Sequence, residues 1–191
     1  MNLYVKSCRL MKKRALNYEP KAVNTLVNID IQIDEYGWTS LDKVEDLCKT
    51  AVQQVCIETK QKFIQGAELC ILLTNNAEIC TLNKQWRGLD KPTNVLSFPA
   101  VSPDKLAKTP MLGDIALGFE TVEQEALNDK KTIENHLTHL VIHGFLHILG
   151  YDHETDADAA RMEGLEIRIL EKINIANPYA DCDLLTMKHQ V

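Results

Sequence analysis

Three histidines in the last third of the chain have the spacing of a metal site. In the segment HGFLHILGYDH, His143 and His147 are four residues apart in an apolar helical stretch, so both rings leave one face of the helix. Gly150 is the residue type that ends a helix in the left-handed conformation, which lets the chain return His153 towards the first two. Three imidazole nitrogens with a fourth position open to water are typical of catalytic zinc. We therefore expect these three histidines to bind one Zn²⁺ per chain.

Two further histidines precede this segment. His139 lies on the same helical face, which leaves His139, His143 and His147 as an alternative ligand set. A straight helix would spread these three over about 12 Å at 1.5 Å per residue, too far for one ion. We expect His139 to be a neighbour that supports the site, and His136 and His189 to be surface residues.

The residue after His143 argues against an ordinary protease. The spacing H-x-x-x-H-x-x-G-x-x-H is that of the metzincin proteases, which carry a glutamate directly after the first histidine. Gly144 occupies that position and cannot accept a proton, so peptide hydrolysis lacks its general base. An open zinc site would still lower the pKa of a bound water to about 7. A zinc peptidase that recruits its base from elsewhere stays open as an alternative.

The histidine segment and a second block resemble the YbeY endoribonucleases, a bacterial family with organellar relatives. The second block is LNKQWRGLDKPTNVLSFP, from Leu82 to Pro99, with GDIALG following from Gly113. The resemblance covers roughly residues 25–173. It implies a zinc ion on His143, His147 and His153, cleavage of single-stranded RNA, maturation of the 16S rRNA 3′ end and ribosome quality control. It also implies the ribosome or its small subunit, with assembly factors, as partners.

The resemblance further implies that Arg87 acts in catalysis or RNA binding. A guanidinium presents a planar fork that suits phosphate oxygens, whereas the alternative is a solvated cation at a helix end. A non-catalytic ribosome-assembly factor or RNA chaperone with a structural zinc also fits the pattern. Other residues have a functional and a structural interpretation that the sequence leaves open. They are Lys91, Ser97 and Asp152 near the site, Asp114 in GDI, and the aromatic residues Trp86 and Tyr151.

Charge and composition limit the function classes. The net charge of −6 argues against a nonspecific nucleic-acid binder. Residues 80–108 nevertheless carry five cations against two carboxylates, whereas residues 150–171 carry seven carboxylates against two cations. An anionic substrate would therefore meet the first segment. No apolar run approaches the about 18–20 residues of a membrane span, so we expect a cytoplasmic protein without a membrane partner.

Six cysteines are scattered without paired spacing, so we expect reduced, mostly buried thiols and no disulfide framework. They are Cys8, Cys48, Cys56, Cys70, Cys80 and Cys182.

Periodicity predicts an α+β fold, with a small mixed β-sheet packed with helices. The arrangement would be zincin-like, with the metal site at the end of a long helix. Strands are expected at 27–34, 67–74, 94–99 and 113–119, and helices at 41–58, 77–87, 121–129, 132–149 and about 156–173. We expect Thr39 or Ser40 to cap the first helix, and Asn75 or Asn76 to start the second.

A length of 191 residues suits one domain. We expect a single catalytic zinc domain at 27–178 and a C-terminal tail at 179–191. Residues 1–26 are basic and read as a flexible extension, with a mislocated start codon or an organelle presequence as alternatives.

Overall fold

The computed structural model of this chain describes residues 27–180. The basic extension at 1–26, Cys8, Cys182 and His189 lie outside the described residues, as does the tail from 181. The strands are β1 (Asn28–Ile33), β2 (Glu68–Thr74), β3 (Val95–Pro99) and β4 (Met111–Gly118). The helices are α1 (Val44–Thr59), α2 (Asn76–Arg87), α3 (Phe119–Asn128), α4 (Ile133–Ile148) and α5 (Asp156–Lys172). Two short 3₁₀ helices, Tyr36–Ser40 and Pro103–Lys108, complete the fold.

The four strands form one mixed sheet in the order β1-β2-β4-β3. β1 and β4 both run parallel to β2, while β3 runs antiparallel to β4. In this register Ile115 of β4 lies opposite both Ile71 of β2 and Ser97 of β3. The predicted α+β class with a small mixed sheet is confirmed.

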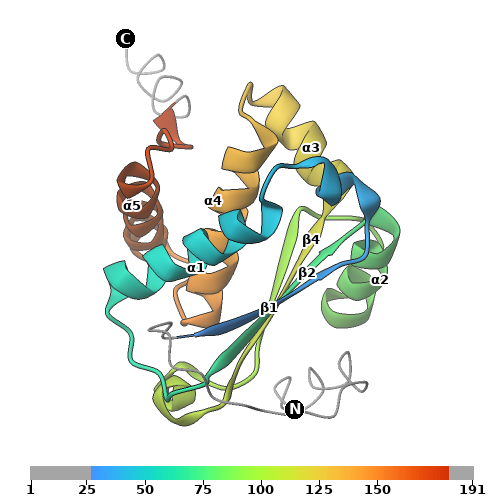
Figure 1. The fold of residues 1–191 in the computed structure, drawn as a ribbon. Coiled ribbons are helices and arrows are strands. Elements are labelled where there is room, and N and C mark those ends of the chain that lie inside the picture. Colours follow the sequence, from blue (N-terminus) through green and yellow to red (C-terminus); the bar gives the residue numbers. More distant parts are fainter. Residues whose placement is uncertain (1–26, 181–191) are drawn as a thin grey trace.

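Helices cover both faces of the sheet, as Figure 1 shows, with α1, α4 and α5 on one side and α2 on the other. Alternate side chains of a strand point to opposite faces, so one strand supplies both layers. Leu69 and Ile71 of β2 belong to the core beneath α1 and α4, whereas Leu72 packs on the α2 side. His143 and His147, which α4 carries, therefore lie on the α1 and α4 side of the sheet.

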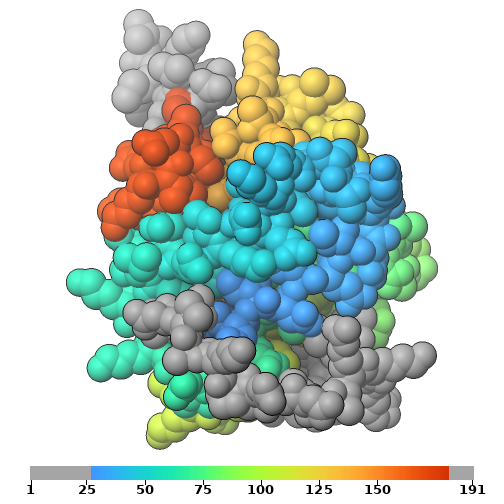
Figure 2. Space-filling model, viewed as in Figure 1, coloured from blue at the N-terminus to red at the C-terminus, as the bar shows by residue number. Residues whose placement is uncertain are grey.

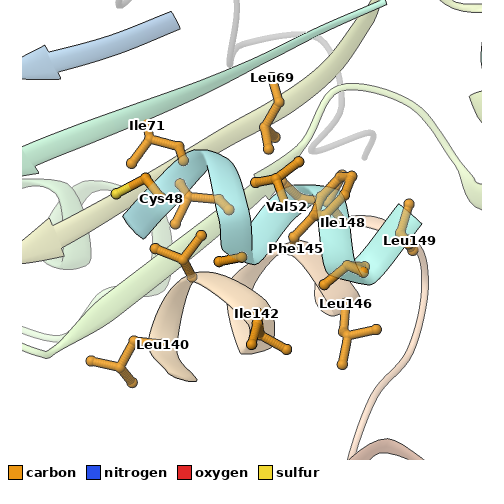
Figure 3. Packing of buried hydrophobic residues seen from close by; sticks show 14 of the residues in the cluster. Cys48, Val52, Leu69, Ile71, Leu140, Ile142, Phe145, Leu146, Ile148 and Leu149 are labelled. Carbon is orange, nitrogen blue, oxygen red and sulfur yellow. The ribbon is translucent and has the colours of Figure 1, made fainter. Parts of the chain in front are cut away.

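Helix α4 is the centre of the core. It contacts α1, α3, α5, β3 and β4, and ten of its sixteen residues are buried. Figure 3 shows Phe145 and Ile148 of α4 close to Val52 of α1, and Leu140 and Ile142 belong to the same buried cluster. This packing fixes the rotation of α4 about its axis, and so fixes the direction in which its histidines point.

Helix α5 packs beside α1 on the face seen in Figure 2. Glu58 of α1 accepts hydrogen bonds from Arg168 Nε at 3.0 Å and from Lys172 Nζ. Exposed ion pairs of this kind contribute little, typically about 0–1 kcal/mol. The buried Leu165, Ile169 and Leu170 therefore hold α5 in place.

The predicted start of the first helix is wrong. Thr39 and Ser40 do not cap α1, because their hydroxyls donate to Tyr36 O and Gly37 O within the 3₁₀ turn. α1 begins at Val44 instead, after Lys43 in a left-handed conformation (φ 54°) without a side-chain cap. The prediction for the second helix is confirmed, since the Asn75 side chain accepts from Glu78 N.

The buried cysteines behave as core residues. Burial raises the pKa of the Cys48 thiol to about 12 and that of Cys56 to about 11. Neither thiol is a nucleophile at neutral pH. In the part of the chain that the structure describes, no helix combines the length and apolar character that crossing a membrane requires.

Candidate metal centre

His143 and His147 leave α4 on the same face, one turn apart. Thr132 starts the helix by accepting a hydrogen bond from Asn135 N at 3.2 Å, so the predicted N-terminus is correct. The two ring centroids are 4.6 Å apart, and the two Nε2 atoms are 3.1 Å apart. Helical spacing thus brings both nitrogens to a common point.

The third histidine returns through the turn at Gly150. This residue has φ +91°, and the amide of Tyr151 donates to Leu146 O at 3.0 Å across the helix end. The His153 ring centroid then lies 5.6 Å from that of His143 and 5.0 Å from that of His147. Asp152 stabilises the turn, because its Oδ1 accepts from His153 N at 2.8 Å.

The donor set fits a zinc ion. One ligand nitrogen from each of His143, His147 and His153 lies within 4.8 Å of the other two. Bonds of about 2.0–2.1 Å in tetrahedral geometry would place two ligand nitrogens about 3.3 Å apart. The observed 3.1 Å between the Nε2 atoms of His143 and His147 agrees with this spacing. The alternative set that contains His139 does not form such a cluster among residues 27–180.

The site keeps His147 neutral. Its pKa is lowered to about 4, first by burial and then by the neighbouring imidazoles of His143 and His153. A metal ligand must present an unprotonated nitrogen. The electrostatics of the cluster therefore favour the form of His147 that binds a cation.

A buried carboxylate lies directly behind the histidine cluster. Glu166 of α5 is completely buried, and its Oε1 accepts a hydrogen bond from His143 Nδ1 at 2.7 Å. Its Oε2 accepts from His139 Nε2 at 3.2 Å and from the Tyr179 hydroxyl. Burial alone would raise the pKa of Glu166, but the bonds from His139 and His143 outweigh it and lower the pKa to about 2.

Sequence reasoning missed Glu166 as a site residue, although α5 carries a signal. Glu166 lies in the apolar stripe of α5, beside Leu165 and between Met162 and Ile169, all of which are buried. A carboxylate in such a stripe requires a buried partner. His139, expected only as a neighbour, is one of the partners found.

The expectation that His136 lies on the surface is wrong. Helix α3 covers this part of α4, and His136 is only 6% exposed. Its Nε2 lies 2.8 Å from Glu125 Oε2, and the same carboxylate accepts from Asn94 Nδ2 at 3.0 Å. His136 is thus a core histidine in a polar cluster of its own.

A pocket of about 270 Å³ opens beside His147. Arg87 at the end of α2, Ser97 of β3 and Asp152 line it together with His147. Arg87 is exposed, and within residues 27–180 no carboxylate pairs with it. The structure therefore places the Arg87 side chain at the edge of the histidine site, as the sequence predicts.

The packing around Gly144 disfavours a glutamate directly after His143. A Cβ atom at residue 144 would lie 3.0 Å from Ser97 Oγ and 3.1 Å from Ile115 Cγ2. Helix α4 approaches the sheet too closely for a longer side chain at this point. The space beside residue 144 is filled by the Ser97 hydroxyl.

Four further residues had both a functional and a structural interpretation, and the structure places only Tyr151 at the pocket beside His147. Tyr151 lines the pocket, with the Arg161 guanidinium 5.1 Å from its ring centroid. Trp86 packs on Phe98 with ring centroids 5.7 Å apart, which favours the packing interpretation. Asp114 lines a separate pocket on the other sheet face with Asp30 and Cys70, and the Lys91 side chain is exposed outside both pockets.

Comparison with known proteins agrees with this geometry. The family model "Endoribonuclease YbeY" matches residues 31–174. Endoribonuclease YbeY of Bradyrhizobium diazoefficiens is 52% identical over 128 residues, covering 65% of this chain and 70% of the relative. Endoribonuclease YbeY of Sinorhizobium fredii is 46% identical over 165 residues, covering 82% of this chain and 94% of the relative.

A solved structure shares the fold. The solution structure of TM1509 from Thermotoga maritima has a TM-score of 0.50 and 29% sequence identity, covering 76% of this chain and 91% of that one. The histidine cluster, the arginine beside it and these matches lead to one conclusion: the chain belongs to the YbeY endoribonuclease family.

Proposed function

We propose that this protein is a zinc-dependent endoribonuclease specific for single-stranded RNA. It acts in the maturation of the 16S rRNA 3′ end and in ribosome quality control in the cytoplasm, with the small ribosomal subunit and its assembly factors as partners. Its catalytic domain spans residues 27–178, flanked by the extension at 1–26 and the tail at 179–191. One observation carries the proposal: the imidazoles of His143, His147 and His153 converge, and His147 lines a pocket with the exposed Arg87, which no carboxylate of residues 27–180 pairs with.

The convergence of His143, His147 and His153 supports these three residues as the ligands of the ion. When bound, zinc supplies a Lewis acid beside the scissile phosphate. RNA brings its own nucleophile in the 2′-OH, so the absence of a carboxylate at residue 144 is compatible with cleavage of this substrate. The same absence is not compatible with an ordinary peptidase.

Arg87 holds the phosphate in this proposal. Its guanidinium offers two parallel donors and stays charged at any working pH, so it binds phosphate oxygens and stabilises the negative charge that grows during cleavage. Its position at the pocket edge, together with the cation excess of residues 80–108, supports this role.

Arg87→Ala tests the proposal. We expect cleavage of a single-stranded rRNA fragment to fall by about 10²–10³-fold, because a preorganised charge at the phosphate is lost. Zinc content and thermal unfolding should not change, since Arg87 is exposed and is not a ligand.

Lys84→Ala is the matched control. Lys84 is an exposed cation on the same helix, but its Nζ is paired with Asp90 Oδ2 at 2.6 Å and it does not line the pocket. Cleavage by this variant should stay near that of the wild type. Undiminished cleavage by Arg87→Ala would remove Arg87 from the mechanism. Normal ribosome maturation without any cleavage would favour a non-catalytic assembly factor with a structural zinc.

A further inference from the structure

The completely buried Glu166 has no role in the cleavage step described above. We infer that Glu166, held in turn by His139 and Tyr179, is a positioning residue that fixes the tautomer and ring orientation of His143. The inference rests on the proposed metal site, because it concerns how one ligand is presented to the ion.

The first step is the bond between Glu166 and His143. An ionised carboxylate can only accept, so the 2.7 Å contact requires the proton of His143 to sit on Nδ1. A neutral imidazole has one ring proton, which leaves the lone pair of Nε2 free. That Nε2 atom lies 3.1 Å from Nε2 of His147, on the side of the ligand cluster. Glu166 therefore selects the nitrogen that faces the metal.

The second step concerns what holds Glu166. Its other oxygen, Oε2, accepts from the Tyr179 hydroxyl and from His139 Nε2. The Tyr179 and His139 rings meet edge to face, with centroids 5.8 Å apart. A carboxylate with both oxygens bonded cannot rotate without losing a buried hydrogen bond. The orientation of the carboxylate, and through it that of the His143 ring, is thereby fixed.

The third step is energetic. Ion-paired groups in a core are often replaced by apolar residues without loss of stability, so stability alone does not account for a carboxylate at residue 166. Apolar neighbours on both sides in α5 show that the position would suit such a residue. Orientation of a metal ligand is a task that an apolar side chain cannot perform.

The anchoring also ties the chain after α5 to the metal site. Tyr179 lies beyond α5, in the segment that the predicted domain boundary assigned to the tail. Lys131, just before α4, donates to Pro178 O at 3.3 Å and holds the same segment from the other side. The last described residues thus contribute to the metal centre without reaching the ion.

Glu166→Met removes both oxygens at nearly constant volume, and Glu166→Gln restores one acceptor. ¹⁵N-resolved NMR of the metal-free protein at pH 8 should show His143 protonated on Nδ1 in the wild type. In Glu166→Met, protonation of Nε2 should appear. Zinc affinity, measured by competition with a chromophoric chelator, should fall by about 10–100-fold. Glu166→Gln should recover most of both properties.

Glu163→Met is the matched control, an exposed glutamate one turn earlier on α5. It should leave the tautomer and the zinc affinity as in the wild type. If Glu166→Met does not fold by circular dichroism, Tyr179→Phe replaces it and should shift both readouts in the same direction by a smaller amount. Wild-type His143 protonated on Nε2, or unchanged affinity and tautomer in the folded variants, would overturn the inference. Neither readout depends on RNA cleavage, so the role of Glu166 can be tested even if the proposed nuclease activity is absent.

Discussion

The close approach of α4 to the sheet at Gly144 leaves little room for a side chain at the position where a zinc protease with the same histidine spacing carries its base. A Cβ at residue 144 would press on Ser97 Oγ and Ile115 Cγ2, and a longer side chain would have to displace them. These two residues lie opposite each other on β3 and β4, so the constraint comes from the sheet and not from α4 alone. In the proposed reaction, groups around the pocket such as Arg87 act in place of a carboxylate on the helix.

This constraint predicts opposite effects at two helical glycines. Gly164→Ala in α5 should raise the free energy of unfolding by about 0.5–1 kcal/mol, because alanine is the better helix former and its Cβ meets only Arg168 Nη1 at 3.5 Å. Gly144→Ala should not raise the free energy of unfolding, because its Cβ presses on Ser97 and Ile115. Gly144→Glu should lower the free energy of unfolding by about 1–3 kcal/mol or more through overpacking. Urea unfolding of the metal-free variants measures both. A stable Gly144→Glu protein would show that α4 can move away from the sheet.

At the scale of elements, the turn after α4 determines the position of His153, the third histidine of the cluster. Gly150 combines φ +91° with close packing on Pro103, because a Cβ there would lie 2.4 Å from Pro103 Cγ. The 3₁₀ helix that begins at Pro103 thus presses on the segment that carries His153. The position of that ligand depends on an element that is far away in the sequence.

Gly150→Ala should therefore disturb both stability and metal binding. We expect a loss of about 2–4 kcal/mol, from left-handed strain of about 1–2 kcal/mol plus the clash with Pro103. Zinc affinity should fall because His153 is displaced. Gly88→Ala separates the two causes, since Gly88 has φ +74° with nothing within 4 Å of its Cβ position. It should show the backbone strain alone and wild-type zinc affinity. Equal effects of the two substitutions would contradict the packing argument.

The element scale also explains which parts of the site the sequence reveals. His143, His147, Gly150 and His153 lie within one short window, so the helix and the glycine turn directly after it indicate that the three histidines converge. Glu166 reaches His143 only because α5 packs on α4. No spacing rule connects two such elements, and the same holds for Ser97 beneath Gly144.

The predictions that proved wrong, for His136 and for the start of α1, also failed because they depend on contacts that the local sequence does not show. His136 was expected on the surface because no local pattern shows that α3 covers it. The hydroxyls of Thr39 and Ser40 resembled helix caps, but a 3₁₀ turn uses them as donors to its own carbonyls. Strand and helix positions were more predictable, because burial on one or two faces imposes a period on each segment.

At the scale of the whole molecule, the site joins three layers. The ligands come from α4 and the turn after it, the pocket residues from α2 and β3, and the positioning carboxylate from α5. Unfolding any of these layers dismantles the centre. Zinc bound at the proposed site would therefore stabilise the entire fold, by an amount that grows with the free zinc concentration.

Global stability should also report on the ligand cluster through pH. The pKa of His147 is about 4 in the folded protein, against an ordinary value of 6.5. As the pH falls below 6.5, the unfolded chain takes up a proton at His147 that the folded protein does not bind until about pH 4. The unfolded state is favoured throughout this window, while above pH 6.5 the effect vanishes. The lowered pKa of Glu166 acts only at more acidic pH, between 4.5 and about 2.

We therefore expect the metal-free protein to lose about 1–2 kcal/mol of unfolding free energy at His147 between pH 7 and pH 4.5, allowing for partial exposure of the ring. Urea denaturation of the wild type and of His147→Gln, at both pH values and with a chelator present, measures this loss. The variant lacks the titrating ring, so its stability should fall less over the same range. Parallel losses in the two proteins would mean that His147 does not resist protonation in the folded state, and that its two imidazole neighbours do not act on it as their geometry implies.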